Sequence, residues 1–198
     1  MARYASLAEV KLYRGIATTE TSDDTLLTSL IERAEEQIDS YCHRVFVAPT
    51  TAATHYFDAV RDISADRKTL YLDDDLATIV CVTNNNESGT ALASTHYTTE
   101  PRNDTPYHAI RLTGRSDSLW TWSEAPEDAI EVNGRWGYAT TVPADIAHAT
   151  IRLAGYLYSQ KDSSVYDVTA MPDAGVITVP QGLPRDVREI LDPYRRLR

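Results

Sequence analysis

Three consecutive carboxylates form the densest group of side chains in this sequence that could do chemistry. Asp73, Asp74 and Asp75 directly follow the apolar run 70–72, which is typical of the end of a strand. Carboxylates at a strand end can bind Mg²⁺ or Ca²⁺, because both ions prefer oxygen ligands. A metal-dependent hydrolase that uses these three residues is therefore one alternative function. The spacing does not match a Ca²⁺-binding loop, and a solvated acidic turn is the simpler interpretation.

The other residue types that bind metals or act as nucleophiles form no recognisable pattern. The five histidines are scattered and lack the spacing of zinc ligands. Cys42 and Cys81 favour buried thiols in a reducing compartment over a disulfide framework. The sequence has no Gly-x-Ser-x-Gly elbow, no phosphate-binding glycine loop and no dinucleotide fingerprint. We therefore expect no catalytic residues, no metal, no cofactor and no enzymatic activity.

Composition limits the partners that the chain can have. The 198 residues include 19 Lys+Arg and 29 Asp+Glu, so the formal net charge is −10. This charge argues against a general nucleic-acid binder, whose contact surface would be basic, but it does not exclude a protein that DNA must slide past, because an acidic wall repels phosphate. The apolar runs are far shorter than the roughly 18 residues needed to span a bilayer, and the start of the chain lacks the apolar core of a signal peptide. We expect no membrane partner.

Two segments with a strong helical period lie on either side of a β-rich middle. Apolar residues recur at three- and four-residue steps over 26–42 and over 146–158, and each run predicts a long amphipathic helix. Between them, residues 54–136 alternate β-branched and aromatic residues with turn residues, which predicts short strands. The remaining expected elements are two short helices, at 5–13 and 184–191, and a long loop at 162–182.

These elements predict an α+β fold. Its core is a pair of long antiparallel helices with short terminal helices, and a β-rich insertion, either an antiparallel sheet or a small barrel, lies between the long helices. The two helices can pack together only if the strands are inserted between them. Residues 1–53 and 137–198 are therefore predicted to form the helical domain with a C-terminal tail, and residues 54–136 the insertion.

The C-terminal segment differs in charge from the rest of the chain. Residues 185–198 hold five arginines against three acidic residues, a net charge of +2, which leaves −12 for the remainder. A basic tail on an acidic body indicates docking on an acidic partner or a neighbouring subunit. Local pairing of the arginines at a frayed terminus is the alternative.

Three stretches of the chain resemble the head–tail connector (adaptor) proteins of tailed bacteriophages. Residues 24–46 are similar to the opening helix of that family and the residues that follow it. Residues 130–149 resemble its strand, its Gly-Trp-Gly-Tyr turn and the entry into its second long helix, and residues 182–196 resemble its closing helix and tail. The residues that match the family motifs are Tyr41, Arg44, Phe46, Gly134, Trp136, Gly137, Tyr138, Pro143, Asp145 and Ile146.

The resemblance implies a structural virion protein at the head–tail interface, made in the host cytoplasm. Subunits would form a ring, a dodecamer in this family, beneath the portal protein, and would contact a stopper or tail-completion protein on the other side. Double-stranded DNA would pass through the ring without sequence recognition. A different neck or tail-completion protein, such as a stopper or terminator, is the runner-up.

The resemblance also implies a role for the tail. Residues carried over from the family would dock on the portal, with arginines as salt-bridge donors. The segment 162–182 would become ordered on assembly. The tail residues concerned are Pro193, Tyr194, Arg195, Arg196, Leu197 and Arg198.

Overall fold

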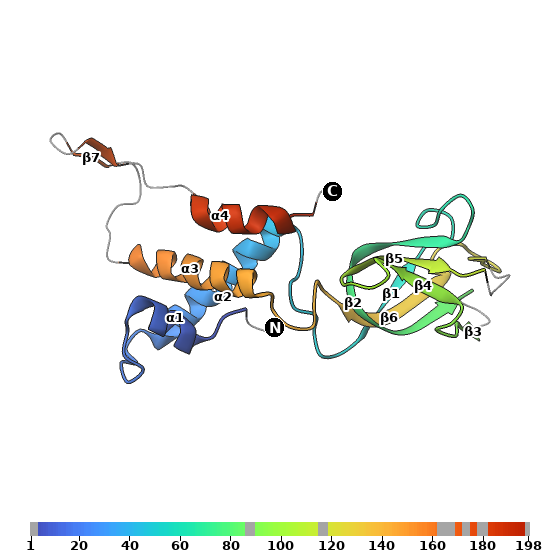
Figure 1. Ribbon diagram of the computed structural model, residues 1–198, viewed down its shortest axis with the longest axis horizontal. Coiled ribbons are helices and arrows are strands. Elements are labelled where there is room, and N and C mark those ends of the chain that lie inside the picture. The colour runs from blue at the N-terminus through green and yellow to red at the C-terminus, as the bar shows by residue number, and fades with distance from the viewer. Residues whose placement is uncertain are drawn as a thin grey trace. The chain divides into compact units, whose positions relative to one another are not determined.

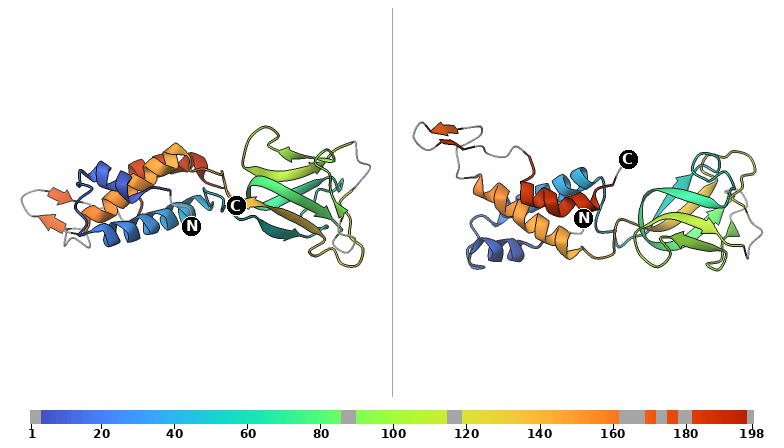
Figure 2. Two further views of the ribbon diagram at one scale, coloured as in Figure 1. Left: turned by 90° about the horizontal axis from the view of Figure 1, so that it is seen from below. Right: turned by 45° about the horizontal axis from the view of Figure 1, so that its top comes forward.

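The computed structural model describes residues 4–85, 90–114, 119–161, 169–171, 175–177 and 182–196. The chain divides into two compact units. Residues 44–141 form one, called here the sheet unit, and residues 3–43 with 142–198 form the other, called the helical unit (Figures 1 and 2). The units therefore change at 43/44 and 141/142, whereas the sequence-predicted limits lie at 53/54 and 136/137.

Local signals set the ends of the helices. The first helix begins after Ser6, whose hydroxyl caps the backbone of Glu9 while the Glu9 carboxylate returns to the Ser6 N–H, and it ends at Gly15 in the left-handed conformation. The second helix ends at His43, which also has a positive φ of 53°. The helices of this unit are α1 (Leu7–Arg14), α2 (Asp24–Cys42), α3 (Ala144–Ser159), α4 (Arg185–Leu191) and the short 3₁₀ helix η1 (Asp192–Tyr194).

The helical unit buries one apolar stripe from each of its longer helices. α2 and α3 pack against each other, and both contact α4. The stripes follow the three- and four-residue spacing of the sequence, as expected for amphipathic helices. Side chains with no exposed surface include Leu27, Ile31, Ile38, Ile146 and Leu153.

The sheet unit is an antiparallel sheet with strand order β1-β6-β2-β5-β4, in which β3 pairs with β2. The 16-residue β2 pairs with β5 along its first part and with β6 along its second. Its register shifts at several points, and such irregularities bend a strand. The strands are β1 (Ala53–Phe57), β2 (Thr69–Asn84), β3 (Thr90–Ala91), β4 (Tyr97–Glu100), β5 (Tyr107–Leu112) and β6 (Ile130–Trp136).

The structure shows that the predicted fold class is wrong. The described residues hold four α-helices, of 8, 19, 16 and 7 residues, and they contain no helical core of two long antiparallel helices that carries the strands as an accessory. The sheet instead encloses its own hydrophobic cluster. The periodicity of the sequence marked which faces are buried but did not say against what they pack. Fully or almost fully buried members of the sheet cluster include Phe57, Leu70, Ile110, Trp120 and Val132.

Part of the predicted loop 162–182 forms two short paired strands. β7 (Thr169–Met171) pairs antiparallel with β8 (Gly175–Ile177), and most of the rest of this segment lies outside the described residues, so its predicted ordering on assembly stays a prediction. Among the described helices, none has both the length and the apolar character needed to cross a membrane.

Candidate functional site

The carboxylate run at the middle of β2 does not form one site. Asp75 is buried, and its Oδ2 accepts a hydrogen bond from Arg44 Nη1 at 2.8 Å. Asp73 and Asp74 are exposed, and Asp73 Oδ1 lies 3.5 Å from Nδ1 of His55. The run thus separates into a buried ion pair and an exposed acidic pair, and the hydrolase alternative, which needs all three carboxylates together, has no support.

His55 lies beside the exposed pair Asp73 and Asp74, and the sequence does not reveal this proximity. One donor atom from each of His55, Asp73 and Asp74 lies within 4.8 Å of the others. The imidazole stacks on the indole of Trp136, with ring centroids 3.7 Å apart and an interplanar angle of 8°. Trp136 Nε1 in turn donates to the carbonyl of Ala53 at 2.9 Å. These donors are grouped, but groups of exposed carboxylates are common without a metal, and no cofactor role follows.

Three residues that match the family motifs meet at one end of the sheet unit. The guanidinium carbon of Arg44 lies 5.4 Å from the centroid of the Tyr138 ring, and the Phe46 and Tyr138 rings are 5.6 Å apart. The backbone joins the same two segments, because the Tyr138 N–H donates to the Val45 carbonyl at 2.8 Å. Arg44 is thus held by an ion pair to Asp75 and by an aromatic face. The motif residues that surround it position the chain where it enters and leaves this unit.

Two glycines of the family motif lie where another backbone segment passes too close to leave room for a side chain. A Cβ on Gly134 would lie 2.4 Å from the Thr78 carbonyl oxygen, beside one of the irregularities of β2. Gly137 has φ +153°, and a Cβ there would lie 2.7 Å from the backbone nitrogen of Ala48. Its own N–H donates to the Asp75 carbonyl at 2.7 Å. Both glycines therefore allow two segments of the sheet unit to pass within backbone contact.

The base of the C-terminal tail is attached to the helical unit. The Tyr41 hydroxyl donates to Asp192 Oδ1 at 2.5 Å, and the Tyr194 hydroxyl donates to Asp145 Oδ2 at 3.0 Å. The hydrogen bond to Asp192 raises the pKa of Tyr41 above its ordinary value. The tail thereby joins the end of α2 to the start of α3, two places that the family resemblance had marked separately.

The last described residues continue the same attachment. The Arg196 N–H donates to the Cys42 carbonyl at 2.9 Å, and the Arg195 guanidinium carbon lies 5.5 Å from the centroid of the Tyr41 ring. Pro193 and Arg195 are exposed, whereas Arg196 is half-buried. The predicted docking residues Leu197 and Arg198 lie outside the described residues.

The remaining motif residues begin α3. Pro143 occupies the position immediately before the helix, with φ −62° and ψ 141°. Asp145 lies in the first turn, where its negative charge suits the helix dipole, and Ile146 is fully buried. These residues form the start of α3, where the chain re-enters the helical unit.

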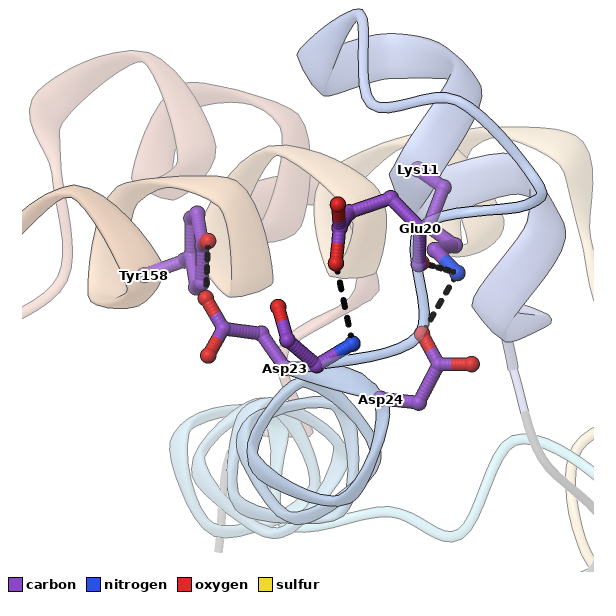
Figure 3. A network of polar contacts seen from close by, with 6 residues as sticks. Lys11, Glu20, Asp23, Asp24 and Tyr158 are labelled. Atoms are coloured by element: carbon purple, nitrogen blue, oxygen red, sulfur yellow. Dashed lines mark hydrogen bonds and ion pairs between the residues drawn. The ribbon is translucent and has the colours of Figure 1, made fainter.

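Sequence reasoning missed a polar network that fastens the loop between α1 and α2 (Figure 3). The Lys11 side chain is 4% exposed, and its Nζ lies 2.5 Å from Asp24 Oδ1 and donates to the Glu20 carbonyl. Asp23 accepts hydrogen bonds from Lys161 at 2.7 Å and from Tyr158 at 2.6 Å, and these bonds, that from Lys161 most, lower the pKa of its carboxyl. The only signal in the sequence is the acidic pair at the start of a helix, which does not identify partners more than a hundred residues away.

The chain was also compared with known protein families and with curated proteins. A family model described as head completion protein matches residues 4–197. Among curated proteins, none matches the chain.

Solved structures show the same fold at low sequence identity. A chain from the neck of an empty GTA particle, computed with C6 symmetry, matches with TM-score 0.60 and 16% identity, over 97% of this chain and 89% of that one. A chain from the virion of a native gene transfer agent particle matches with TM-score 0.58 and 18% identity, over 97% and 89%. A chain from the neck of a native GTA particle, computed with C12 symmetry, matches with TM-score 0.56 and 17% identity, over 97% and 88%. Because the family model covers almost the whole chain, the protein belongs to the head completion protein family, and the predicted structural role in a phage-type head–tail connector is confirmed.

Proposed function

We propose that this protein is a non-enzymatic subunit of a ring in the virion neck, located beneath the portal and open at its centre for DNA. The observation that carries this proposal is the family match over residues 4–197. The fold matches add support, because two of those structures are necks with C6 or C12 symmetry. The proposed ring size is twelve, which the neck computed with C12 symmetry supports.

The proposed partners are the portal protein on one side and a stopper or tail-completion protein on the other. The net charge of −10 suits a passage for DNA, because an acidic wall weakens adhesion of the phosphate backbone. The other proposed partners are neighbouring copies of this protein in the ring.

The proposed portal-docking segment is the tail from Pro193 to Arg198. Its base is held by Tyr194 on Asp145 and by the Arg196 backbone on Cys42, so the tail leaves the helical unit from a fixed point. The Arg195 side chain is exposed there and is available to an acidic surface of the portal.

The test is reconstitution with the portal protein of the same phage, imaged by negative-stain electron microscopy. Wild type should form a ring stacked on the portal. The double variant Arg195→Glu, Arg196→Glu should lose portal binding, whereas Arg102→Glu, which reverses an exposed arginine of the sheet unit, should keep it. Stacking of the ring on a stopper or tail component instead of the portal would favour the runner-up. Equal portal binding by wild type and the double variant would refute the role of the tail.

A further inference from the structure

A groove in the helical unit adjoins the base of the C-terminal tail. It has a volume of about 710 Å³ and lies between α2, α3 and the segment that precedes α4. This volume is within the roughly 300–1,000 Å³ of sites that bind a drug-sized ligand, so a short peptide segment can enter it. Half of the residues that line the groove are polar or charged, and its lining includes Arg33, Gln37, Ser40, Tyr41 and Leu183.

One wall of the groove is a polar stripe along α2. Arg33, Gln37 and Ser40 follow one another at steps of four and three residues, so they lie on one side of the helix. Arg33 and Ser40 are exposed, and Gln37 is half-buried. Within the described part of the chain, none of these three side chains has a hydrogen-bond or ion-pair partner. Their donors and acceptors can therefore bind a ligand that enters the groove.

Two exposed arginines lie at the edge of the groove, next to the tail. Arg188 Nη2 donates to the carbonyl of Leu183, which lines the groove, at 3.4 Å. The guanidinium carbon of Arg195 lies 5.5 Å from the centroid of the Tyr41 ring, which also lines it. The hydrogen bond to Asp192 raises the pKa of Tyr41, and the positive charges of both arginines oppose this rise, as expected if both lie near the hydroxyl.

The groove and its edge are basic, although the chain as a whole is acidic. Three arginines and two acidic residues lie there, which gives a local net charge of +1 against −10 for the whole chain. Carboxylates suit such a site, because guanidinium groups bind them with two parallel hydrogen bonds. A DNA duplex, the other anion expected in the neck, is too wide to enter a cavity of this volume. The five residues are Arg33, Arg188, Arg195, Glu36 and Asp192.

We infer that an extended acidic segment of the portal protein occupies this groove, beside the tail that docks on the same partner. The groove is continuous with the proposed docking tail, because Tyr41 belongs to its lining and also contacts Asp192 and Arg195. Its arginines complement the acidic portal surface that the tail would bind. The polar stripe of α2 would bind the carboxylates and the backbone groups of the segment. The inference rests on the proposed function and adds a second contact with the same partner.

Photo-cross-linking of the full-length chain to the portal protein of the same phage tests the occupant. p-Benzoylphenylalanine replaces Ser40 in the groove or, as a control, Ser29, an exposed residue of α2 outside the lining. The probe at Ser40 should attach to the portal, and mass spectrometry should locate the cross-link in a segment rich in Asp and Glu. The probe at Ser29 should give much less of this product. A cross-link from Ser40 to a second copy of this chain, to a stopper or to a portal segment without acidic residues would overturn the inference.

Substitutions in the groove provide the second test, with portal affinity measured by biolayer interferometry. Arg33→Glu reverses a charge of the stripe, and Ser40→Trp fills part of the groove from an exposed position. Each should weaken portal binding at least ~5-fold, because a misplaced charge or a filled groove opposes an acidic ligand. Arg33→Lys keeps the charge and should retain most of the affinity. Arg14→Glu is the matched control, since it reverses an exposed arginine of the same unit outside this lining.

The outcomes separate the inference from the proposed function. If wild type does not bind the portal, the proposed function fails, and the inference fails with it. If Arg195→Glu, Arg196→Glu loses binding while Arg33→Glu and Ser40→Trp bind as wild type does, the tail docks without the groove and only the inference is refuted. Equal weakening by Arg14→Glu would also refute it, because the effect would then not be specific to the groove.

Discussion

Arg44 and Asp75 form an ion pair that joins the entry of the sheet unit to the middle of β2. Arg44 Nη1 lies 2.8 Å from Asp75 Oδ2, and the two side chains are 19% and 7% exposed. The backbone of Asp75 also accepts the N–H of Gly137, so one residue is bonded to the segments that enter and leave the unit. The pair is therefore structural, although the sequence placed Asp75 in a candidate metal cluster.

Removal of the charge at Asp75 should destabilise the protein. Asp75→Asn leaves the half-buried Arg44 without its counter-charge, and we expect a loss of about 1–3 kcal/mol in the free energy of unfolding. Asp74→Asn changes an exposed neighbour and should shift stability by less than about 0.5 kcal/mol. Urea unfolding followed by circular dichroism measures both. Equal stability of Asp75→Asn and wild type would show that the pair contributes nothing.

A methyl group at Gly137 should disrupt the same region. The added Cβ would lie 2.8 Å from the Ala48 Cα, and the φ of +153° is unfavourable for alanine. We expect Gly137→Ala to lower the free energy of unfolding by about 1–3 kcal/mol or more, because of steric overlap and backbone strain. Gly114→Ala is the control, since a Cβ there meets nothing within 4 Å. Thermal melts of the two variants should differ clearly, and matching melting temperatures would contradict the described approach of the two segments.

Asp39 should make stability fall as the pH rises through the weakly acidic range. Burial raises the pKa of its carboxyl to about 6, with smaller upward contributions from Glu35 and Glu36, although a hydrogen bond from Tyr4 acts in the opposite direction. The folded state thus binds the proton more tightly than the unfolded state, whose value is 3.8. The contribution of Asp39 to the free energy of unfolding is complete below pH 3.8, where the carboxyl is protonated in both states, and it is lost as the pH rises through about 6.

The variant Asp39→Asn isolates this effect. Its amide keeps an acceptor for the Tyr4 hydroxyl but cannot ionise. Relative to wild type, its melting temperature should improve as the pH rises from about 4 to 7, because wild type then carries an unfavourable charge at a partly buried position. Melting curves at several pH values supply the comparison. If the melting-temperature difference between the variant and wild type stays constant across this pH range, the pKa of Asp39 is not raised.

The attachment of the tail should depend on two tyrosine hydroxyls. The double variant Tyr41→Phe, Tyr194→Phe removes the bonds to Asp192 and Asp145, and each loss should cost about 0.5–1.5 kcal/mol locally. Limited trypsin digestion should then cut faster after Arg195 and Arg196, as followed by mass spectrometry. Tyr56→Phe, at an exposed position in the sheet unit, is the control. Unchanged cleavage rates in the double variant would mean that these bonds do not hold the tail.

Local features of this protein were predictable because they depend on neighbouring residues. The spacing of Ile31 and Ile38 defines a buried face at helical period, and both side chains are fully buried in α2. Pro143 and Asp145 are typical of a helix start and lie where α3 begins. The prediction that failed was the core. The apolar residues of the β-rich segment suffice to build a separate hydrophobic cluster. Sequence periodicity shows which face of an element is buried, but it does not show which other element packs against that face.

The sequence by itself determined the helix faces, the acidic charge and the membership in a family of connector proteins, because these follow from residue types and their order. Only the tertiary structure decided that Asp75 is the partner of Arg44, that His55 lies beside Asp73, and that Tyr41 and Asp145 hold the tail. These contacts join residues between 18 and 151 positions apart, and such distances are set by how the elements pack and not by local propensity.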